Sequence, residues 1–207
     1  MIRSKLVALE KRISKSLPGF GIKGTYMFAV PVGQIVRGIN FDRSAYDNVS
    51  FSVTAFMMPL FVPAKHFGFT FGKRIRHAGG GDRWSIDMLN LEIELISALK
   101  QQALPFLSKG ETLEGFIEFA RLGSQTGRTL EGLGYALARA GKTRQAVEVF
   151  DRLVSMLDLN IAWQRELMNQ VRTLSTQLGE HPEEVQKQLA QSEEETIENL
   201  GLKEFRQ

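Results

Sequence analysis

The sequence predicts an α+β fold: an N-terminal helix on an antiparallel β-meander of four or five strands, followed by an all-α segment of about three helical hairpins. Two changes of hydrophobic period support this prediction. Apolar residues recur at helical spacing before residue 18, alternate with polar residues over residues 20–86, and return to helical spacing after residue 89. We therefore expect two domains, an antiparallel-sheet domain over residues 1–88 and a helical-hairpin domain over residues 89–207 docked on it.

The first predicted element is an amphipathic helix over residues 2–17, which Pro18 and Gly19 terminate. The apolar residues of its one face are Leu6, Leu9, Ile13 and Leu17. Charged residues interrupt the apolar positions, so the segment lacks the continuous apolar core of a secretory signal. We expect this helix to lie across a sheet.

Four segments then carry the signals of β-strands, namely residues 25–30, 34–41, 49–56 and 68–75. The links between them are short and rich in turn-forming residues. Short links favour an antiparallel meander, because parallel strands need long crossover connections. In the third strand, the apolar residues Phe51, Val53 and Ala55 are expected to face the core, and the hydroxyl residues between them a wetter side.

An apolar run from Met57 to Pro63 follows the third strand. The run is bounded by prolines, and the longer apolar segment that contains it, Phe51 to Val62, is too short to form a membrane-spanning helix. Exposing it to water would be costly, so it forms either part of the core or an interface, and burial in the core is the commoner outcome for such runs.

Helical periodicity after residue 89 predicts three hairpins. The first pairs a helix that ends near Pro105 with residues 112–122, the second pairs 129–140 with 143–157, and the third pairs 161–178 with 182–200. The apolar stripe of the first helix is Leu89, Ile93, Ile96, Leu99 and Leu104. Gly110, Gly141 and Gly179 precede the second helices and are expected to adopt positive φ. The acidic final segment is expected to fray.

The second hairpin carries a spaced set of small and large residues, namely Leu130, Leu133, Gly134, Leu137, Gly141, Ala146 and Phe150. At these spacings, residues of about 128–157 resemble a tetratricopeptide repeat. Independently of that resemblance, Gly134 and Ala146 lack bulk where two helices would cross, and Phe150 would fill the space beside them.

The first half of the chain resembles the bacterial family known as domain of unknown function 4304, over about residues 5–100. The matching segments are Gly19-Phe20, residues 24–28, 39–44 and 49–53, Arg74-Ile75, and residues 82–86. The resemblance implies a small α+β domain without an established activity. It also implies a place among bacterial proteins that include immunity proteins against secreted toxins.

Composition and charge narrow the classes of function. Residues 1–109 hold 15 Lys and Arg against 7 Asp and Glu, whereas residues 110–207 hold 11 against 16. A basic first half could attract nucleic acid or an acidic protein, although ordinary solvated faces would carry the same charges. The absence of cysteine excludes disulfides and thiolate metal sites and suits a reducing compartment, so we expect a cytoplasmic protein without a membrane span.

The candidate partner-binding or anion-binding site is a basic hairpin over residues 73–83. Its candidate residues are Lys73, Arg74, Arg76, His77 and Arg83. Three consecutive glycines at its tip would expose backbone N–H groups, which could hold a phosphate or an acidic side chain. A plain flexible hairpin is the alternative. The histidines His66, His77 and His181 lack a second ligand at metal-binding spacing, so we expect no metal and no cofactor.

No pattern for catalysis is present: carboxylates do not pair on one helix face, and no serine has a nucleophile motif around it. We therefore expect a non-catalytic protein-binding module, an adaptor or a bacterial immunity protein that neutralises a cognate toxin by covering its active surface. The alternative is a nucleic-acid-associated protein, or an enzyme whose site the sequence conceals, built on the basic hairpin. The expected partner is another protein.

Overall fold

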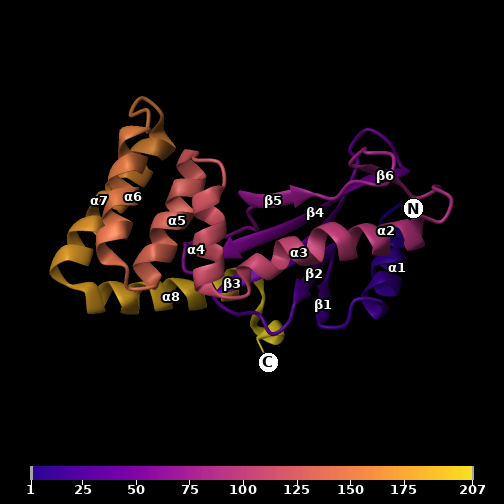
Figure 1. The fold of residues 1–207 in the computed structure, drawn as a ribbon, viewed down its shortest axis with the longest axis horizontal. Helices are drawn as coiled ribbons and strands as arrows, with labels where there is room; N and C mark the ends of the chain where they lie inside the picture. Colours follow the sequence, from indigo (N-terminus) through magenta and orange to yellow (C-terminus); the bar gives the residue numbers. More distant parts are fainter. Residues whose placement is uncertain (1, 207) are drawn as a thin grey trace. The chain divides into compact units, whose positions relative to one another are not determined.

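The computed structural model describes residues 2–206 and confirms an α+β fold with an antiparallel sheet. The strands are β1 (Phe20–Lys23), β2 (Tyr26–Ala29), β3 (Ile35–Arg43), β4 (Ser50–Pro59), β5 (Phe71–Arg74) and β6 (Arg83–Ser85). The helices are α1 (Ile2–Lys15), α2 (Leu91–Ala98), α3 (Leu104–Leu107), α4 (Leu113–Leu122), α5 (Gly127–Arg139), α6 (Thr143–Ser155), α7 (Ala162–Glu180) and α8 (Pro182–Leu200). A π-helical turn, η1 (Leu99–Ala103), and two 3-10 turns, η2 (Ser108–Gly110) and η3 (Lys203–Phe205), complete the order (Figure 1).

The chain forms two compact units. The sheet unit comprises the residues up to 58, residues 68–111 and the residues from 202 onward, and the helical unit comprises residues 59–67 and 112–201. The predicted boundary between residues 88 and 89 lies inside the sheet unit. The first predicted hairpin divides between the units, because α2 and α3 belong to the sheet unit and α4 belongs to the helical unit.

The sheet is a meander in the order β1-β2-β3-β4-β5, and β6 also pairs with β4. The four predicted strands correspond to β2, β3, β4 and β5. Two strands, β1 and β6, lie outside the four predicted segments: β1 has a glycine among its four residues, and β6 has only three residues. The register sets Trp84 opposite Phe51 and Arg83 opposite Ser52.

The core of the sheet unit contains the apolar face of α1, which contacts β1 and β3. Its residues Leu6, Leu9, Ile13 and Leu17 are buried, as predicted. Trp84 is fully buried on the apolar side of the sheet, and its indole N–H donates to the Ile75 carbonyl at 3.0 Å. Ile75 and Trp84, which lie on either side of the tip of the basic hairpin, are therefore anchored in the core.

One acidic residue of α1 is also in this core. Glu10 is fully buried, and neither carboxyl oxygen has a hydrogen-bond partner among the described residues. Burial raises the pKa of Glu10 from 4.5 to about 7, because a charged carboxylate is poorly solvated there.

The last described residues return to the sheet unit. Phe205 packs against Phe28, with ring centroids 5.4 Å apart, and its carbonyl accepts from the Val32 N–H at 2.7 Å. A Cβ on Gly21 would lie 2.5 Å from the Phe205 ring, so glycine is needed at this contact. Residues that follow the helical unit thus complete the aromatic core of the sheet unit.

The predicted apolar stripe of the first helix is wrong in part. Leu99 is buried as predicted, but Leu89 and Ile93 are exposed. Leu91 and Leu95, which lie outside the predicted stripe, are buried. Asn90 adopts a left-handed conformation immediately before α2, so the helix begins after Leu89. The face of α2 that carries Leu91 and Leu95 is therefore the one that packs into the core.

The helix also continues through Pro105, where the sequence predicted an end. A proline lacks the N–H that a helical hydrogen bond needs and its ring crowds the preceding turn. The π-helical turn η1 lies directly before it, and the Leu104 N–H donates to the Leu99 carbonyl, five residues back. Pro105 then occupies the first turn of α3, where no N–H is required.

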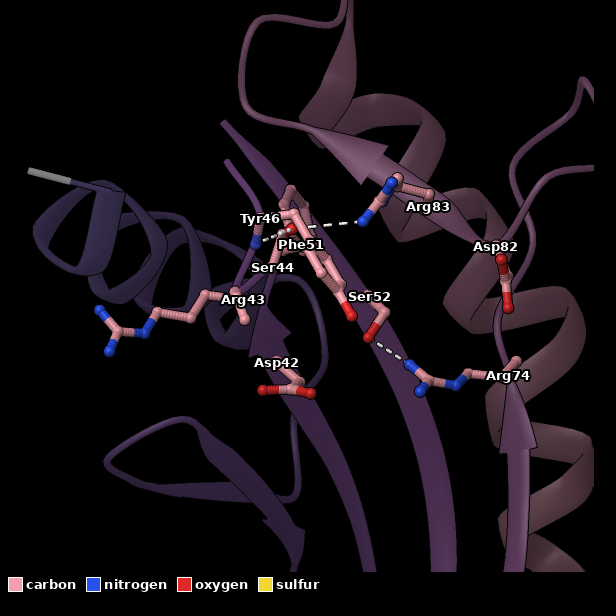
Figure 2. Close-up of a pocket in the computed structure, with 10 residues that line it drawn as sticks. Asp42, Arg43, Ser44, Tyr46, Phe51, Ser52, Arg74, Asp82 and Arg83 are labelled. Atoms are coloured by element: carbon pink, nitrogen blue, oxygen red, sulfur yellow. Dashed lines mark hydrogen bonds between the residues drawn. The ribbon is translucent and has the colours of Figure 1, made fainter. Parts of the chain in front are cut away.

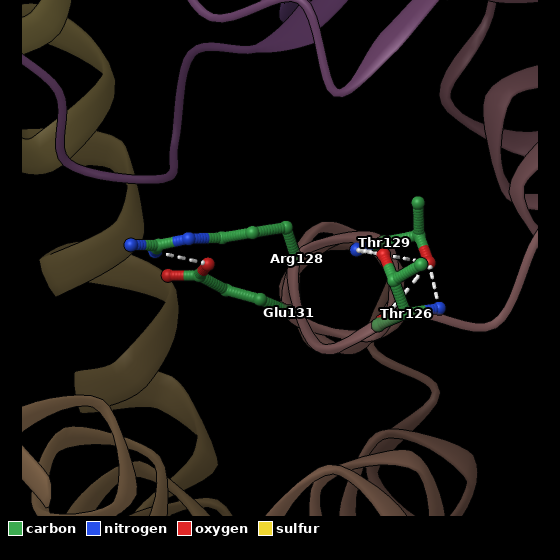
Figure 3. Close-up of polar contacts among 4 residues, drawn as sticks. All are labelled: Thr126, Arg128, Thr129 and Glu131. Carbon is green, nitrogen blue, oxygen red and sulfur yellow. Dashed lines mark hydrogen bonds and ion pairs between the residues drawn. The ribbon is translucent and has the colours of Figure 1, made fainter. Parts of the chain in front are cut away.

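The hairpin of α5 and α6 confirms the predicted close crossing. Ala146 and Phe150 are fully buried, and a Cβ on Gly134 would overlap the Phe150 ring. Figure 1 shows α5, α6 and α7 side by side in the helical unit. A reciprocal pair of hydroxyl hydrogen bonds between Thr126 and Thr129 caps the start of α5 (Figure 3).

Only one of the three hairpin glycines has the predicted positive φ. Gly141 has φ of +70°, and the Lys142 N–H donates to the Leu137 carbonyl, which closes the end of α5. Gly110 does not; it lies in η2 against Met57, and a Cβ there would be 2.6 Å from the Met57 sulfur. Gly179 lies within the last turn of α7. The three glycines, which we predicted to share one type of turn, therefore lie in three different backbone structures.

The apolar run after β4 is confirmed as core in its first part, because Met57, Leu60 and Phe61 are fully buried. Its continuation in the helical unit contacts α8 through backbone atoms. The Ala64 N–H donates to the Thr196 hydroxyl at 3.3 Å, and the Asn199 amide donates to the Ala64 carbonyl at 3.2 Å.

The acidic final helix does not fray as expected. Instead, α8 is helical through Leu200 and ends at Gly201, which has φ of +61°. Buried residues along α8, including Val185, Leu189 and Ile197, hold its inner face against the helical unit.

Candidate functional site

The register of β4, β5 and β6 brings two of the predicted site residues to one face of the sheet. Arg83 is opposite Ser52, and Arg74 is opposite Thr54, which points to the same side as Ser52. Lys73 precedes Arg74 on β5, so its side chain points to the opposite side of the sheet. The five predicted residues therefore do not form one cluster.

An open pocket of about 640 Å³, which we call the arginine pocket, lies beside Arg74 and Arg83. Its polar and aromatic lining is Asp42, Arg43, Ser44, Tyr46, Phe51, Ser52, Arg74, Asp82 and Arg83 (Figure 2). Figure 2 shows that the Arg43 guanidinium points away from those of Arg74 and Arg83. Arg74 and Arg83 are thus the two cations that face the pocket.

Both guanidinium groups contact neutral hydroxyls. Arg74 donates to the Ser52 hydroxyl, and Arg83 donates to the Ser44 hydroxyl at 3.2 Å. A guanidinium group forms stronger hydrogen bonds with a carboxylate or a phosphate than with a hydroxyl. The two serines hold the guanidinium groups in place without neutralising their charge, so both remain available to an anionic group.

Tyr46 is 92% exposed, the highest value among the large hydrophobic side chains of the described residues. A tight turn between β3 and β4 carries it. The Asp47 carboxylate accepts from the Val49 N–H at 3.0 Å and from the Ser50 N–H, and these bonds lower the pKa of Asp47. The Ser44 N–H also donates to the Ser50 carbonyl at 2.8 Å. Hydrogen bonds at the base of the turn therefore hold the backbone around Tyr46, while its aromatic ring stays exposed to solvent.

The glycine tip does not present the row of free N–H groups that we expected. The Gly79 N–H donates to Nδ1 of His77 at 3.1 Å, and the Gly80 N–H donates to the His77 carbonyl at 2.8 Å. The imidazole also packs edge-on against Trp84, with ring centroids 5.7 Å apart. Two of the three glycine N–H groups therefore donate hydrogen bonds to His77, which stabilises the turn.

Arg76 lies outside the arginine pocket. Its backbone N–H donates to the Gln102 side-chain oxygen at 3.0 Å, and its carbonyl accepts from the Gln102 amide at 2.7 Å. Gln102 lies in η1, so this double bond joins the basic segment to the helical turn. The Arg76 side chain is exposed beyond it.

Within residues 2–206, no group of three histidine, aspartate or glutamate side chains is placed to hold a metal ion. None of the helices in the same range combines the length and the apolar character that crossing a bilayer requires.

Sequence reasoning found Arg74 and Arg83 but missed Ser44, Tyr46 and Ser52. The available signal was an aromatic residue within a turn-forming segment, followed by a strand whose hydroxyl residues share one face. The pairing of β6 with β4 was the missing step, because it places Arg83 opposite Ser52 and within reach of Ser44.

No family model, curated protein or solved structure matches this chain. The resemblance of the first half to a bacterial family therefore stays a prediction.

Proposed function

We propose that this chain is a non-catalytic protein-binding module, an adaptor or a bacterial immunity protein that covers the active surface of a toxin. The observation that carries the proposal is Tyr46, which is 92% exposed beside Arg74 and Arg83. Tyrosine and arginine are the residues, with tryptophan, that most often dominate the binding energy of protein interfaces. The immunity role rests in addition on the sequence resemblance described above.

The mode of binding follows from the charges. Arg74 and Arg83 would donate hydrogen bonds to carboxylates of an acidic partner surface, and the Tyr46 ring would supply apolar contact area at a small cost in side-chain entropy. The positive charge of the first half of the chain would speed the encounter with an acidic partner.

The test is affinity capture with the tagged full-length chain, from cells that express the neighbouring genes. We expect one partner protein at near-stoichiometric amounts, and its loss with Tyr46→Ala and with Arg74→Gln/Arg83→Gln. Lys73→Gln is the matched control, because it removes one positive charge from the same strand on the opposite side of the sheet. Recovery of no stoichiometric partner, or equal loss with the control, would contradict the proposal.

A second candidate function is binding of single-stranded nucleic acid. An exposed aromatic ring beside two arginines is also the arrangement on which a base can stack while cations contact the phosphates. Binding to an oligonucleotide should then weaken steeply as salt increases, since counterions are released. Absence of binding at low salt would remove this alternative and leave the protein-binding proposal standing.

A further inference from the structure

The helical unit has a groove of about 560 Å³ that we call the α4–α6 groove. Its lining is Arg121, Gln125, Leu133, Leu137, Arg144, Gln145, Glu148, Val149 and Arg152. The residues come from α4, α5, α6 and the connection between α4 and α5. All of them belong to one unit, so this groove is separate from the arginine pocket.

Two arginines of the groove are held by neutral amides. Arg121 of α4 donates to the Gln145 side-chain oxygen on α6, and Arg152 of α6 donates to the Gln125 side-chain oxygen at 2.5 Å. Gln125 is itself fixed, because its amide donates to the Gly123 carbonyl at 3.0 Å after the end of α4. The guanidinium groups therefore have defined positions, although no carboxylate contacts them among the described residues.

Two neighbouring arginines of the helical unit, by contrast, pair with carboxylates of their own helices. Arg128 pairs with Glu131 at 2.8 Å (Figure 3), and Arg144 pairs with Glu148 at 3.3 Å. The one carboxylate of the groove, Glu148, is thus already paired with the third arginine. Of the three arginines in the groove lining, Arg121 and Arg152 therefore keep their positive charge without a carboxylate partner among the described residues, in a unit whose sequence is acidic overall.

We propose that the α4–α6 groove binds an acidic segment of a partner polypeptide, whose carboxylates bind Arg121 and Arg152. A carboxylate oxygen forms a stronger hydrogen bond with a guanidinium than the neutral amides of Gln125 and Gln145 do. The amides would move aside or share the guanidinium N–H donors, of which each arginine has five.

The floor of the groove favours a peptide over nucleic acid. Val149 is half-buried and adjoins Leu133 and Leu137 in the lining, so an apolar side chain between two carboxylates could cover it. The lining contains no aromatic ring on which a base could stack, which also favours a peptide. This inference goes beyond the arginine pocket and does not depend on it.

The experiment is a titration of the full chain against a fluorescein-labelled peptide of about 16 residues, built from glutamate, leucine and alanine. The chain carries Arg74→Gln/Arg83→Gln throughout, so that the arginine pocket cannot account for binding. We expect measurable affinity that weakens at least about tenfold with Gln145→Glu and with Arg121→Gln, as loss of one charge-assisted hydrogen bond would cause.

Gln145→Glu has almost the same shape as the original side chain and supplies Arg121 with an internal carboxylate. It therefore tests the charge of the groove without removing a contact. Arg121→Gln removes the charge and leaves a polar side chain on α4, and it still reports if the first variant fails to fold. Arg172→Gln on α7 is the matched control, because this exposed arginine lies outside the groove.

The outcomes separate cleanly. Binding that the groove variants weaken and the control leaves unchanged supports the proposal. The proposal is overturned by no binding at about 1 mM chain, the weak end of measurable affinity. It is equally overturned if a peptide with lysine in place of glutamate binds as well, or if a single-stranded oligonucleotide or inorganic phosphate displaces the acidic peptide more strongly than unlabelled peptide does.

Discussion

The Phe150 ring occupies the position where any side chain on Gly134 would begin. A Cβ built on Gly134 would lie 2.6 Å from Cδ1 of Phe150 and closer still to Cε1. Phe150 is fully buried and also packs edge-on against Tyr135, with ring centroids 5.7 Å apart, so the ring has little room to move. The close crossing of α5 and α6 thus depends on a missing methyl group.

Gly134→Ala is expected to lower the free energy of unfolding by about 1–3 kcal/mol, the usual cost of overpacking a core, despite the better helix propensity of alanine. Gly127→Ala is the control, because its Cβ would make an ordinary contact of 3.7 Å with Leu153. Chemical denaturation of the two variants measures the difference. Equal stabilities would show that Phe150 can move aside, and Gly134→Ala/Phe150→Leu should recover part of the loss.

Glu10 predicts an unusual pH dependence. Its pKa is about 7 in the folded chain against 4.5 normally, so between these values the folded state binds a proton that the unfolded state has released. Stability therefore falls as pH rises from about 5 to 7, by at most about 3 kcal/mol, since one pKa unit corresponds to about 1.4 kcal/mol.

Glu10→Gln keeps the shape of the protonated side chain and should remove this fall. Denaturation curves at several pH values should then diverge, with the variant more stable than the wild type above pH 7. Glu118→Gln, at an exposed position of α4, should follow the wild type. Parallel curves for Glu10→Gln and the wild type would mean that the Glu10 carboxylate finds water or a partner.

The Thr196 hydroxyl is expected to hold the residues after β4 in place within the helical unit. Thr196 is 1% exposed, and its hydroxyl accepts from the Ala64 N–H, so Thr196→Val would leave a donor without a partner and cost about 1–3 kcal/mol. Hydrogen exchange at Ala64 should accelerate. In the control Thr176→Val, only a hydroxyl bonded to its own helix at Arg172 is lost, and exchange at Ala64 should not change.

Asp47 predicts a titration of the turn that carries Tyr46. Hydrogen bonds from the Val49 and Ser50 N–H groups lower its pKa, so the turn is held at neutral pH and loosens when acid protonates the carboxylate. The amide proton shifts of Val49 and Ser50 should titrate together with a midpoint below the ordinary aspartate range. Asp47→Asn should abolish that titration. A midpoint at the ordinary value would contradict the hydrogen bonds.

Long periodic segments made most of the fold predictable. Leu9 and Ile13 in α1 are spaced four residues apart, as one face of a helix requires. In α5 and α6, the small residue Gly134 and the large residue Phe150 indicated where the two helices cross. The face of α2 was not predictable in the same way, because Leu89 and Leu91 are both apolar. The left-handed conformation of Asn90 then decides which one enters the core.

The candidate site was less predictable than the fold. Basic residues close in sequence suggested one cluster, but strand alternation places Lys73 and Arg74 on opposite sides of the sheet. Arg74 and Arg83 come together through their separate pairings with β4, and β6 is too short to be seen in the sequence. The hydrogen bond from the Gly79 N–H to His77 also depends on the folded loop and could not be read from the sequence.

The contact of Phe205 with Gly21 has a consequence for biosynthesis. A ribosome makes the strands and α1 early, but the ring that fills the gap beside Phe28 is translated only after the whole helical unit. Until then Phe28 lacks the aromatic neighbour that covers it in the folded protein. Chaperones that recognise exposed aromatic groups would have that interval in which to act, and a premature stop before codon 202 would remove that neighbour permanently.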